Sequence, residues 1–289
     1  MKRKFKKAVF AVFAVAFTFA LFFAVSPIKE TAYAGGIRAT GATYGSAVGT
    51  TGNAAVISEK PTKKGRKRKK IPEELENVIS AKTFLLNGEP ALAALTGKGE
   101  NYKTDVIIHV VKDGKILYGI KAEDGYSPTI NFFDFGREEK FLFYSSQTGG
   151  SGGYGNYSVY RLRENGSDEI YNVTSDTAAF TGEFASGGKM ILKNVAENGS
   201  LTVDVTYMQK DFYDEVFDKD GNPTGESVNV NAVSAVFPYY NGATGLFGLM
   251  TYRSVTAVAE VNRLGYITQN LVYDGGSFKP LFTDFSIGL

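Results

Sequence analysis

The sequence predicts an antiparallel all-β fold. Five tight-turn signals of the Asn-Gly or Asp-Gly type lie beside short β-rich runs, and such dipeptides adopt the positive φ angles that two-residue hairpins require. The chain contains 33 glycines against 8 prolines, in keeping with many tight turns. Hydrophobic residues make up 43% of its 289 residues, which is an ordinary globular composition.

The first 34 residues have the three parts of a secretory signal peptide. A basic start is followed by eighteen residues, Ala8 to Val25, in which only Thr18 is polar. Pro27 and the small-residue pattern Ala32-Tyr33-Ala34 then mark the expected helix break and cleavage site. We expect cleavage after Ala34, a secreted or cell-surface location and no membrane span after processing. The alternative is an uncleaved anchor, since eighteen apolar residues just suffice to span a bilayer.

Residues 35–70 predict a disordered Gly/Ala/Thr-rich linker that ends in a basic run. The run consists of Lys63, Lys64, Arg66, Lys67, Arg68, Lys69 and Lys70. From Ile71 onward the chain carries 17 basic and 28 acidic side chains, an excess of 11 negative charges. The run is either a solvated linker or an electrostatic tether to an anionic cell-envelope polymer. We expect no specific nucleic-acid partner, because an exported protein has no need of nuclear import.

The folded domain is expected at 71–289. Residues 71–79, with Pro72 and acidic side chains in the first turn, predict one short helix. Hairpin strands are expected at 106–111 and 116–120 around Asp113-Gly114, at 157–162 and 169–173 around Asn165-Gly166, at 190–195 and 201–207 around Asn198-Gly199, at 213–217 before Asp220-Gly221, and at 267–273 and 278–282 around Asp274-Gly275.

A weak internal repeat accompanies these hairpins. Gly88, Gly136, Gly188 and Gly242 are spaced by 48, 52 and 54 residues, each shortly after an aromatic or aliphatic residue. A period near 50 residues is the length of a propeller blade. The predicted architecture is therefore propeller-like hairpin repeats, with a β-sandwich as the alternative.

Two glycine-containing segments carry a resemblance to a known family. Phe132-Phe133-Asp134-Phe135-Gly136 follows Gly125-Tyr126-Ser127-Pro128 and precedes the glycine-rich run 148–154. This part of the chain resembles the VCBS-repeat or FG-GAP-like secreted proteins of Firmicutes. The resemblance implies propeller-like repeats, acidic calcium loops and an extracellular role in binding or adhesion. The corresponding loops here lack the carboxylates that calcium requires, so we expect no metal.

Candidate catalytic groups are few. The chain has no cysteine, which excludes disulfides and thiolate chemistry, and His109 is its single histidine. Gly149-Gly150-Ser151-Gly152-Gly153 matches a nucleophile elbow in spacing, yet no helix is expected after it and the one imidazole lies in an ordinary strand position. Asp218 to Asn222 opens like a calcium loop but lacks the distal Glu, so we expect a turn. We predict no catalytic residue and no cofactor.

Tyrosines near glycine-rich turns form the one candidate binding surface. Tyr154, Tyr157, Tyr239 and Tyr240 are the proposed binding residues, with Tyr160 and Tyr252 in similar positions. Tyrosine beside glycine and serine on a β scaffold can bind carbohydrate or protein. The alternative is that alternate tyrosines line the pleat and only their hydroxyl groups reach water.

Two functions from different classes follow. The first is a secreted, non-catalytic β-repeat protein that binds, or has a structural role, at the cell envelope; a purely structural surface or coat component is its simplest form. The second is an exported hydrolase that acts on glycans through carboxylates that the sequence does not identify. A hydrolase predicts converging acidic side chains in a deep cleft, whereas a binding protein predicts a shallow tyrosine-rich face.

Overall fold

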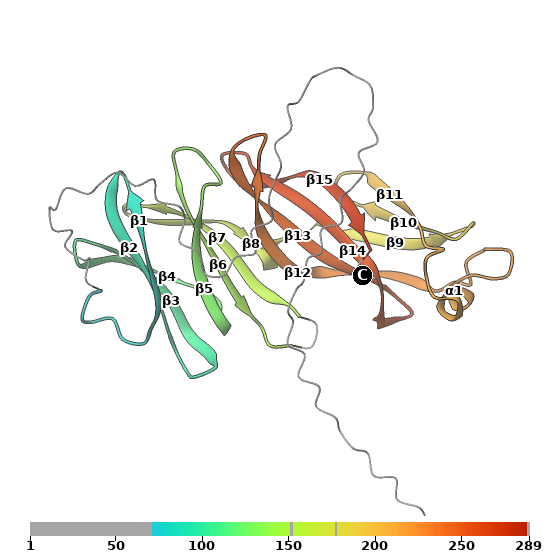
Figure 1. The fold of residues 1–289 in the computed structure, drawn as a ribbon, viewed down its shortest axis with the longest axis horizontal. Coiled ribbons are helices and arrows are strands. Elements are labelled where there is room, and N and C mark those ends of the chain that lie inside the picture. The colour runs from blue at the N-terminus through green and yellow to red at the C-terminus, as the bar shows by residue number, and fades with distance from the viewer. Residues whose placement is uncertain (1–70, 151–152, 177, 288–289) are drawn as a thin grey trace, which may run out of the picture. The chain divides into compact units, whose positions relative to one another are not determined.

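The computed structural model describes residues 71–150, 153–176 and 178–287, and these form two antiparallel sheets (Figure 1). The first sheet consists of β1 (Val78–Leu86), β2 (Glu89–Lys98), β3 (Tyr102–Lys112), β4 (Lys115–Lys121), β5 (Gly125–Phe133), β6 (Lys140–Gln147), β7 (Gly155–Arg163) and β8 (Gly166–Asn172). The second sheet consists of β9 (Phe180–Ala185), β10 (Lys189–Asn194), β11 (Gly199–Asp204), β12 (Ser227–Asn241), β13 (Leu246–Ala257), β14 (Ala259–Tyr273) and β15 (Phe278–Ser286). The prediction of an antiparallel all-β fold is confirmed.

The first sheet folds back on itself at β3. The later part of β3 pairs with both β2 and β4, while its first residues pair with β5. The halves β1–β4 and β5–β8 enclose one apolar cluster, to which Leu95 and Ile108 contribute from one half and Leu142 from the other. Phe84 of β1 and Phe132 of β5 stack with their ring centroids 4.7 Å apart.

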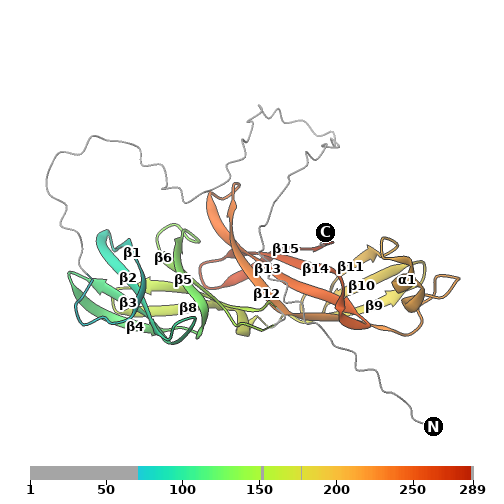
Figure 2. The ribbon, with the colours of Figure 1, turned by 60° about the horizontal axis from the view of Figure 1, so that its bottom comes forward.

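The second sheet has the strand order β11-β10-β9-β12-β13-β14-β15 and encloses its own apolar cluster. The short helix α1 (Lys210–Val216) packs against this cluster, and Figure 2 shows it beside β9–β11. Phe217, directly after the helix, meets the ring of Phe184 at 5.2 Å. Strands β12, β13 and β14 are much longer than β9–β11, so each of them continues beyond this cluster.

A third cluster joins the two sheets. Phe141 and Phe143 of β6 face Leu249 of β13 and Leu271 of β14 in this cluster. The alternate residues of β6, such as Leu142, belong to the core of the first sheet. Both faces of β6 are therefore buried, which explains its uninterrupted apolar run instead of the alternation typical of a half-exposed strand.

A buried ion pair lies on the connection between the sheets. Asp176, in the segment from β8 to β9, accepts a hydrogen bond at 2.5 Å from Arg253 of β13. The two side chains are only 10% and 5% exposed. Arg253 also lies over the ring of Phe180, 5.8 Å from its centroid. The pair fixes the chain where it passes from one sheet to the other.

The predicted hairpin turns form where the dipeptides lie. Asp113 and Gly114 connect β3 and β4 with φ angles of 51° and 78°, as a type I′ turn requires. The four spaced glycines each lie between two sequential, paired strands, the first of them being Gly88 between β1 and β2. Their spacing near 50 residues thus marks hairpin connections within two sheets of eight and seven strands.

Two local predictions are wrong. Residues 71–79 contain no helix: residues 72–75 form a turn in which Leu75 N donates to Pro72 O, and β1 begins at Val78, after Asn77 with a φ of 53°. Residues 213–217, expected as a strand, belong mostly to α1. There Tyr213 and Phe217 stack at 4.7 Å, one helical turn apart, so burial of one helix face outweighs their β propensity.

The signal peptide at 1–34, the linker at 35–70 with its basic run, and Ser151 lie outside the described residues, so these predictions stay as they are. Within the part of the chain that the structure describes, no helix is long and apolar enough to cross a membrane.

Candidate functional site

The structure separates the four predicted tyrosines. Tyr157 is 6% exposed and packs in the cluster between the sheets, which corrects its assignment to a binding surface. Tyr154 is half-buried beside Thr148, whose backbone and side chain both donate to its carbonyl oxygen. Tyr240 is 62% exposed and meets Phe247 edge to face at 5.5 Å. Tyr239, the next residue back, lies on the opposite face of β12.

The outer face of β12–β15 brings aromatic side chains together. Successive residues of a strand point to opposite faces, so Val236, buried in the core between the sheets, places Phe237 and Tyr239 outside. The register then sets the neighbours: Phe237 pairs with Met250, Met250 with Asn270, and Asn270 with Phe282. We call this surface the aromatic strip. It consists of Phe237, Tyr239, Tyr252, Tyr266 and Phe282.

The rings of the strip contact one another across strands. Phe237 and Tyr252 meet edge to face with centroids 5.8 Å apart, and Tyr252 and Tyr266 do so at 6.1 Å. The guanidinium group of Arg263 lies 5.1 Å from the centroid of Tyr266 and donates to its hydroxyl oxygen at 2.5 Å. Phe237 and Phe282 remain 56% and 53% exposed. Two large apolar rings, on the first and the last of four neighbouring strands, are thus left open to solvent.

A glycine shapes one end of the strip. Tyr239 pairs with Gly248 across β12 and β13. A Cβ atom on Gly248 would lie 2.6 Å from the Tyr239 ring and 2.5 Å from the carbonyl oxygen of Leu271. Only glycine therefore lets the ring lie close over the neighbouring strand.

Polar groups accompany the rings. The Tyr252 hydroxyl donates to the thioether sulfur of Met250 at 2.9 Å, and burial raises the pKa of this tyrosine. A thioether is a weak acceptor, so the proton of this hydroxyl is available to a better one. Asn231 donates to Ser254 at 3.0 Å, and Ser254 pairs with Tyr266 across β13 and β14. The strip combines apolar ring surface with neutral and cationic hydrogen-bond donors.

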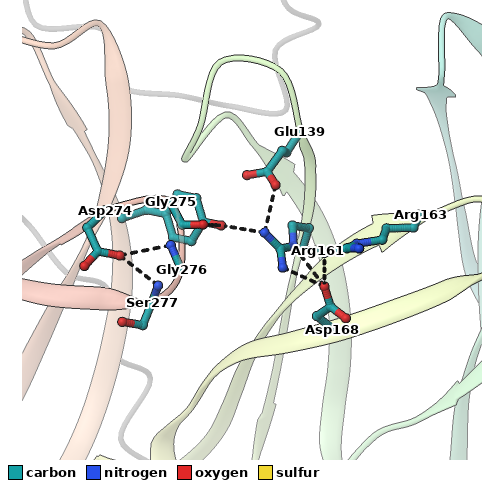
Figure 3. A network of polar contacts seen from close by, with 9 residues as sticks. Glu139, Arg161, Arg163, Asp168, Asp274, Gly275, Gly276 and Ser277 are labelled. Carbon is teal, nitrogen blue, oxygen red and sulfur yellow. Dashed lines mark hydrogen bonds and ion pairs between the residues drawn. The ribbon is translucent and has the colours of Figure 1, made fainter.

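The largest ion-pair network is elsewhere and is satisfied internally (Figure 3). Arg161 of β7 donates to Asp168 at 2.7 and 3.0 Å and to Glu139 at 2.8 Å. It also donates to the hydroxyl of Tyr273 on β14 at 3.0 Å, and that hydroxyl donates to Gly275 O. Arg161 holds the pKa of the Asp168 carboxyl below its usual range. The network clamps the two sheets together and keeps the Asp168 carboxylate paired with a cation.

The other sequence candidates have structural roles. His109 lies in β3 with Nε2 3.1 Å from Thr96 Oγ1, and burial lowers its pKa. The Asp218 carboxylate accepts from the backbone N–H groups of Asp220 and Asn222, which confirms a turn there. Within the described ranges, no group of three or more His, Cys, Asp or Glu side chains is placed to hold a metal ion.

Sequence reasoning found Tyr239 and Tyr252 but missed their partners. Phe237, Tyr266 and Phe282 lie on three different strands, and only the strand register brings them into one row. The signal that was available is the alternation of Phe237 and Tyr239 at a period of two, which is typical of one face of a strand.

One comparison with known proteins locates its match on the sheet that carries the strip. A model of the YybI C-terminal domain family matches residues 178–286, which contain β9–β15. The chain is also similar to the uncharacterised protein YybI of Bacillus subtilis (strain 168), with 23% identity over 177 residues that cover 58% of this chain and 68% of that protein. No solved structure matches significantly. The resemblance to VCBS-repeat proteins stays a prediction.

Proposed function

We propose that the chain is a non-catalytic β protein that binds a glycan of the cell envelope through the aromatic strip. One observation carries this proposal: five aromatic side chains from four adjacent strands lie on one face of the sheet, and two of them, Phe237 and Phe282, are more than half exposed. Contiguous exposed apolar patches of this kind mark binding surfaces more often than structural ones.

The shape of the surface favours a polysaccharide. The rings belong to the outer face of a sheet, where an extended polymer can lie flat. Sugar rings present apolar C–H faces to aromatic rings and hydroxyl groups around their edges. The hydroxyl of Tyr252 and the guanidinium group of Arg263 lie where they can meet those hydroxyl groups. This combination of aromatic body and polar tip is what makes tyrosine frequent in binding surfaces.

The expected affinity is modest for each ring. Full burial of a phenylalanine contributes about 1.5 to 3 kcal/mol, so covering the exposed half of Phe237 contributes about 1 kcal/mol. Because about 1.4 kcal/mol corresponds to a tenfold change in Kd, loss of one ring weakens binding about fivefold. Several rings acting on one polymer chain are needed for stable attachment.

A non-catalytic role agrees with the electrostatics of the described acids. Hydrogen bonds or a neighbouring cation lower the pKa of Asp105, Asp168 and Asp218. None of these three carboxyls is buried without a polar partner. A glycosidase acid needs the opposite change, a raised pKa in an apolar pocket. None of these three carboxyls has the raised pKa that the glycan hydrolase would require.

Secretion and tethering complete the proposal. The signal peptide at 1–34 would export the chain, and the basic run from Lys63 to Lys70 would add a salt-sensitive attraction to anionic envelope polymers. Deletion of Lys63 to Lys70 is expected to release the protein into the medium at lower salt than the full chain. Unchanged partitioning between cells and medium would contradict the tether.

The strip itself is tested by cosedimentation with peptidoglycan sacculi from which the covalently attached anionic polymers have been removed. We expect the double variant Phe237→Ala/Tyr252→Ala to bind about 25-fold more weakly than the unmodified chain, from two fivefold losses. Tyr240→Ala is the matched control, because Tyr240 lies in the same strand as Phe237, is more exposed than Phe237 and points to the opposite face of β12. Equal losses for the control and the double variant, or no sedimentation of the unmodified chain, would contradict the proposal.

A further inference from the structure

A second aromatic site lies in the first sheet. Tyr102 at the start of β3 and Tyr126 in β5 are paired across the two strands and meet edge to face with centroids 5.0 Å apart. Both rings are about two-fifths exposed, at 40% and 41%. Tyr102 lines a hollow of about 530 Å³ whose other lining residues, apart from Ala122, are polar or charged. We call this hollow, with Tyr126 at its side, the tyrosine hollow.

The chain bends sharply to present Tyr126. The pairing of β5 with β6 shifts between Tyr126 and Thr129, and Ser127 has a φ of 47°. A serine in this left-handed region is uncommon and costs free energy, so the surrounding contacts must hold this bend in place. Gly149 then lies so close that a Cβ atom there would be 2.3 Å from the Tyr126 ring. Two segments more than 20 residues apart thus meet around one exposed ring.

The floor of the hollow is held by its own hydrogen bonds. Asn156 donates from its amide to the carbonyl oxygen of Asp124 at 2.9 Å and to Ser146 Oγ at 3.1 Å. The Asp124 carboxylate accepts from the backbone N–H of Val106 at 3.3 Å. These bonds fix the two polar side chains before any ligand arrives, and such preorganisation reduces the entropic cost of binding.

The rim supplies hydrogen-bonding groups of both kinds. Lys121 and Glu123 line the hollow and are exposed, and the Thr148 hydroxyl, which donates its proton to Tyr154 O, can still accept a hydrogen bond. A donor, an acceptor and a hydroxyl around an aromatic pair suit a small polar ring with an apolar face. The volume accommodates one or two sugar units and excludes a folded protein segment.

We propose that the tyrosine hollow binds a single saccharide unit, at an end or branch of the same class of glycan that the aromatic strip holds along its length. This inference rests on the proposed function for the identity of the ligand. The strip belongs to the second sheet and the hollow to the first, so one chain would contact the polymer at two places. Two linked weak sites bind a long polymer far more tightly than either site binds a short fragment.

The absence of tryptophan from the sequence allows each site to carry its own reporter. A Tyr126→Trp variant places the sole indole at the hollow, and a Tyr252→Trp variant places it on the strip. Each is titrated with soluble glycan strands released from peptidoglycan and with four-sugar fragments of them. We expect both reporters to change emission with either ligand, and the long strands to bind about tenfold or more tightly. Adding Tyr102→Ala to the Tyr126→Trp variant should weaken its response to the fragments at least fivefold.

The outcomes separate the two proposals. A response of the strip reporter with none at the hollow would overturn this inference and leave the proposed function standing. A response at the hollow alone would support the hollow and contradict the strip. If neither reporter changed its emission, both proposals would be overturned. Tyr102→Trp, at an equally exposed position, serves as a second reporter of the hollow if Tyr126→Trp does not fold.

Discussion

Removal of the Asp176 carboxylate should destabilise the protein severely, because it leaves a buried positive charge without its partner. Arg253 is 5% exposed and Asp176 10%, and the hydrogen bond between them measures 2.5 Å. The Nε atom of Arg253 already has no hydrogen-bond partner among the described residues. Without the Asp176 carboxylate, the guanidinium group would keep only a long contact, 3.4 Å, with the carbonyl oxygen of residue 176 and its contact with the ring of Phe180.

The size of the effect follows from the burial. Breaking a buried ion pair by removing one partner costs about 3 to 5 kcal/mol. For a folded part of this size, about 1 kcal/mol shifts Tm by roughly 2 to 4 °C, so Asp176→Ala should lower Tm by roughly 6 to 20 °C. The double variant Asp176→Ala/Arg253→Met should lose less, since it leaves no unpaired charge.

Thermal unfolding followed by circular dichroism gives the comparison. Glu183→Ala is the matched control: it breaks the pair with Lys193, whose side chains are 56% and 52% exposed, and such surface pairs contribute about 0 to 1 kcal/mol. If Asp176→Ala lowered Tm no more than Glu183→Ala does, the argument that this pair holds the connection between the sheets would be refuted.

Three further predictions concern other parts of the fold. Burial lowers the pKa of His109, so the unfolded chain binds the proton more readily than the folded one. Stability should therefore fall as the pH drops below about 6.5. The urea midpoint of His109→Gln should change less between pH 7.5 and 5.5 than that of the unmodified chain. Gly248→Ala should cost about 1 to 3 kcal/mol and weaken glycan binding by displacing Tyr239, whereas Gly242→Ala, with open space around it, should alter neither urea midpoint nor binding. Arg161→Ala should lower the urea midpoint through loss of its contacts with both sheets yet leave cosedimentation with sacculi unchanged; a loss of binding at unchanged stability would contradict its structural role.

Local turn chemistry made the hairpins predictable. Asp113-Gly114 requires only its own backbone freedom and the apolar runs on either side, and both are visible in the sequence. The helix at 210–216 was not predicted because Tyr213, Val216 and Phe217 have high β propensity. That these three residues share a helix face becomes visible only from their contact with the apolar cluster of the second sheet. Propensity here gives way to tertiary packing.

The candidate site was only partly predictable for a related reason. Tyr239 and Tyr157 look alike in sequence, since both lie near glycines in β-rich segments. Their exposure differs because the face of β7 that carries Tyr157 packs against the second sheet, while the outer face of β12 is open. That difference depends on how strands more than 60 residues apart in the chain, β7 and β12, are packed in the two sheets, which single-strand patterns do not encode. The placement of Phe237 and Phe282 on one face of the sheet depends on strand register in the same way.

The claim that the outer face of β12–β15 binds glycan is tested most directly by comparing sole tryptophans on the two faces of the sheet. Tyr252→Trp reports on the aromatic strip, and Tyr240→Trp reports on the opposite face of β12. On titration with soluble peptidoglycan glycan strands, we predict a saturable shift of emission to shorter wavelength for Tyr252→Trp and none for Tyr240→Trp. A shift for Tyr240→Trp alone, or for neither variant, would contradict the strip as the binding surface.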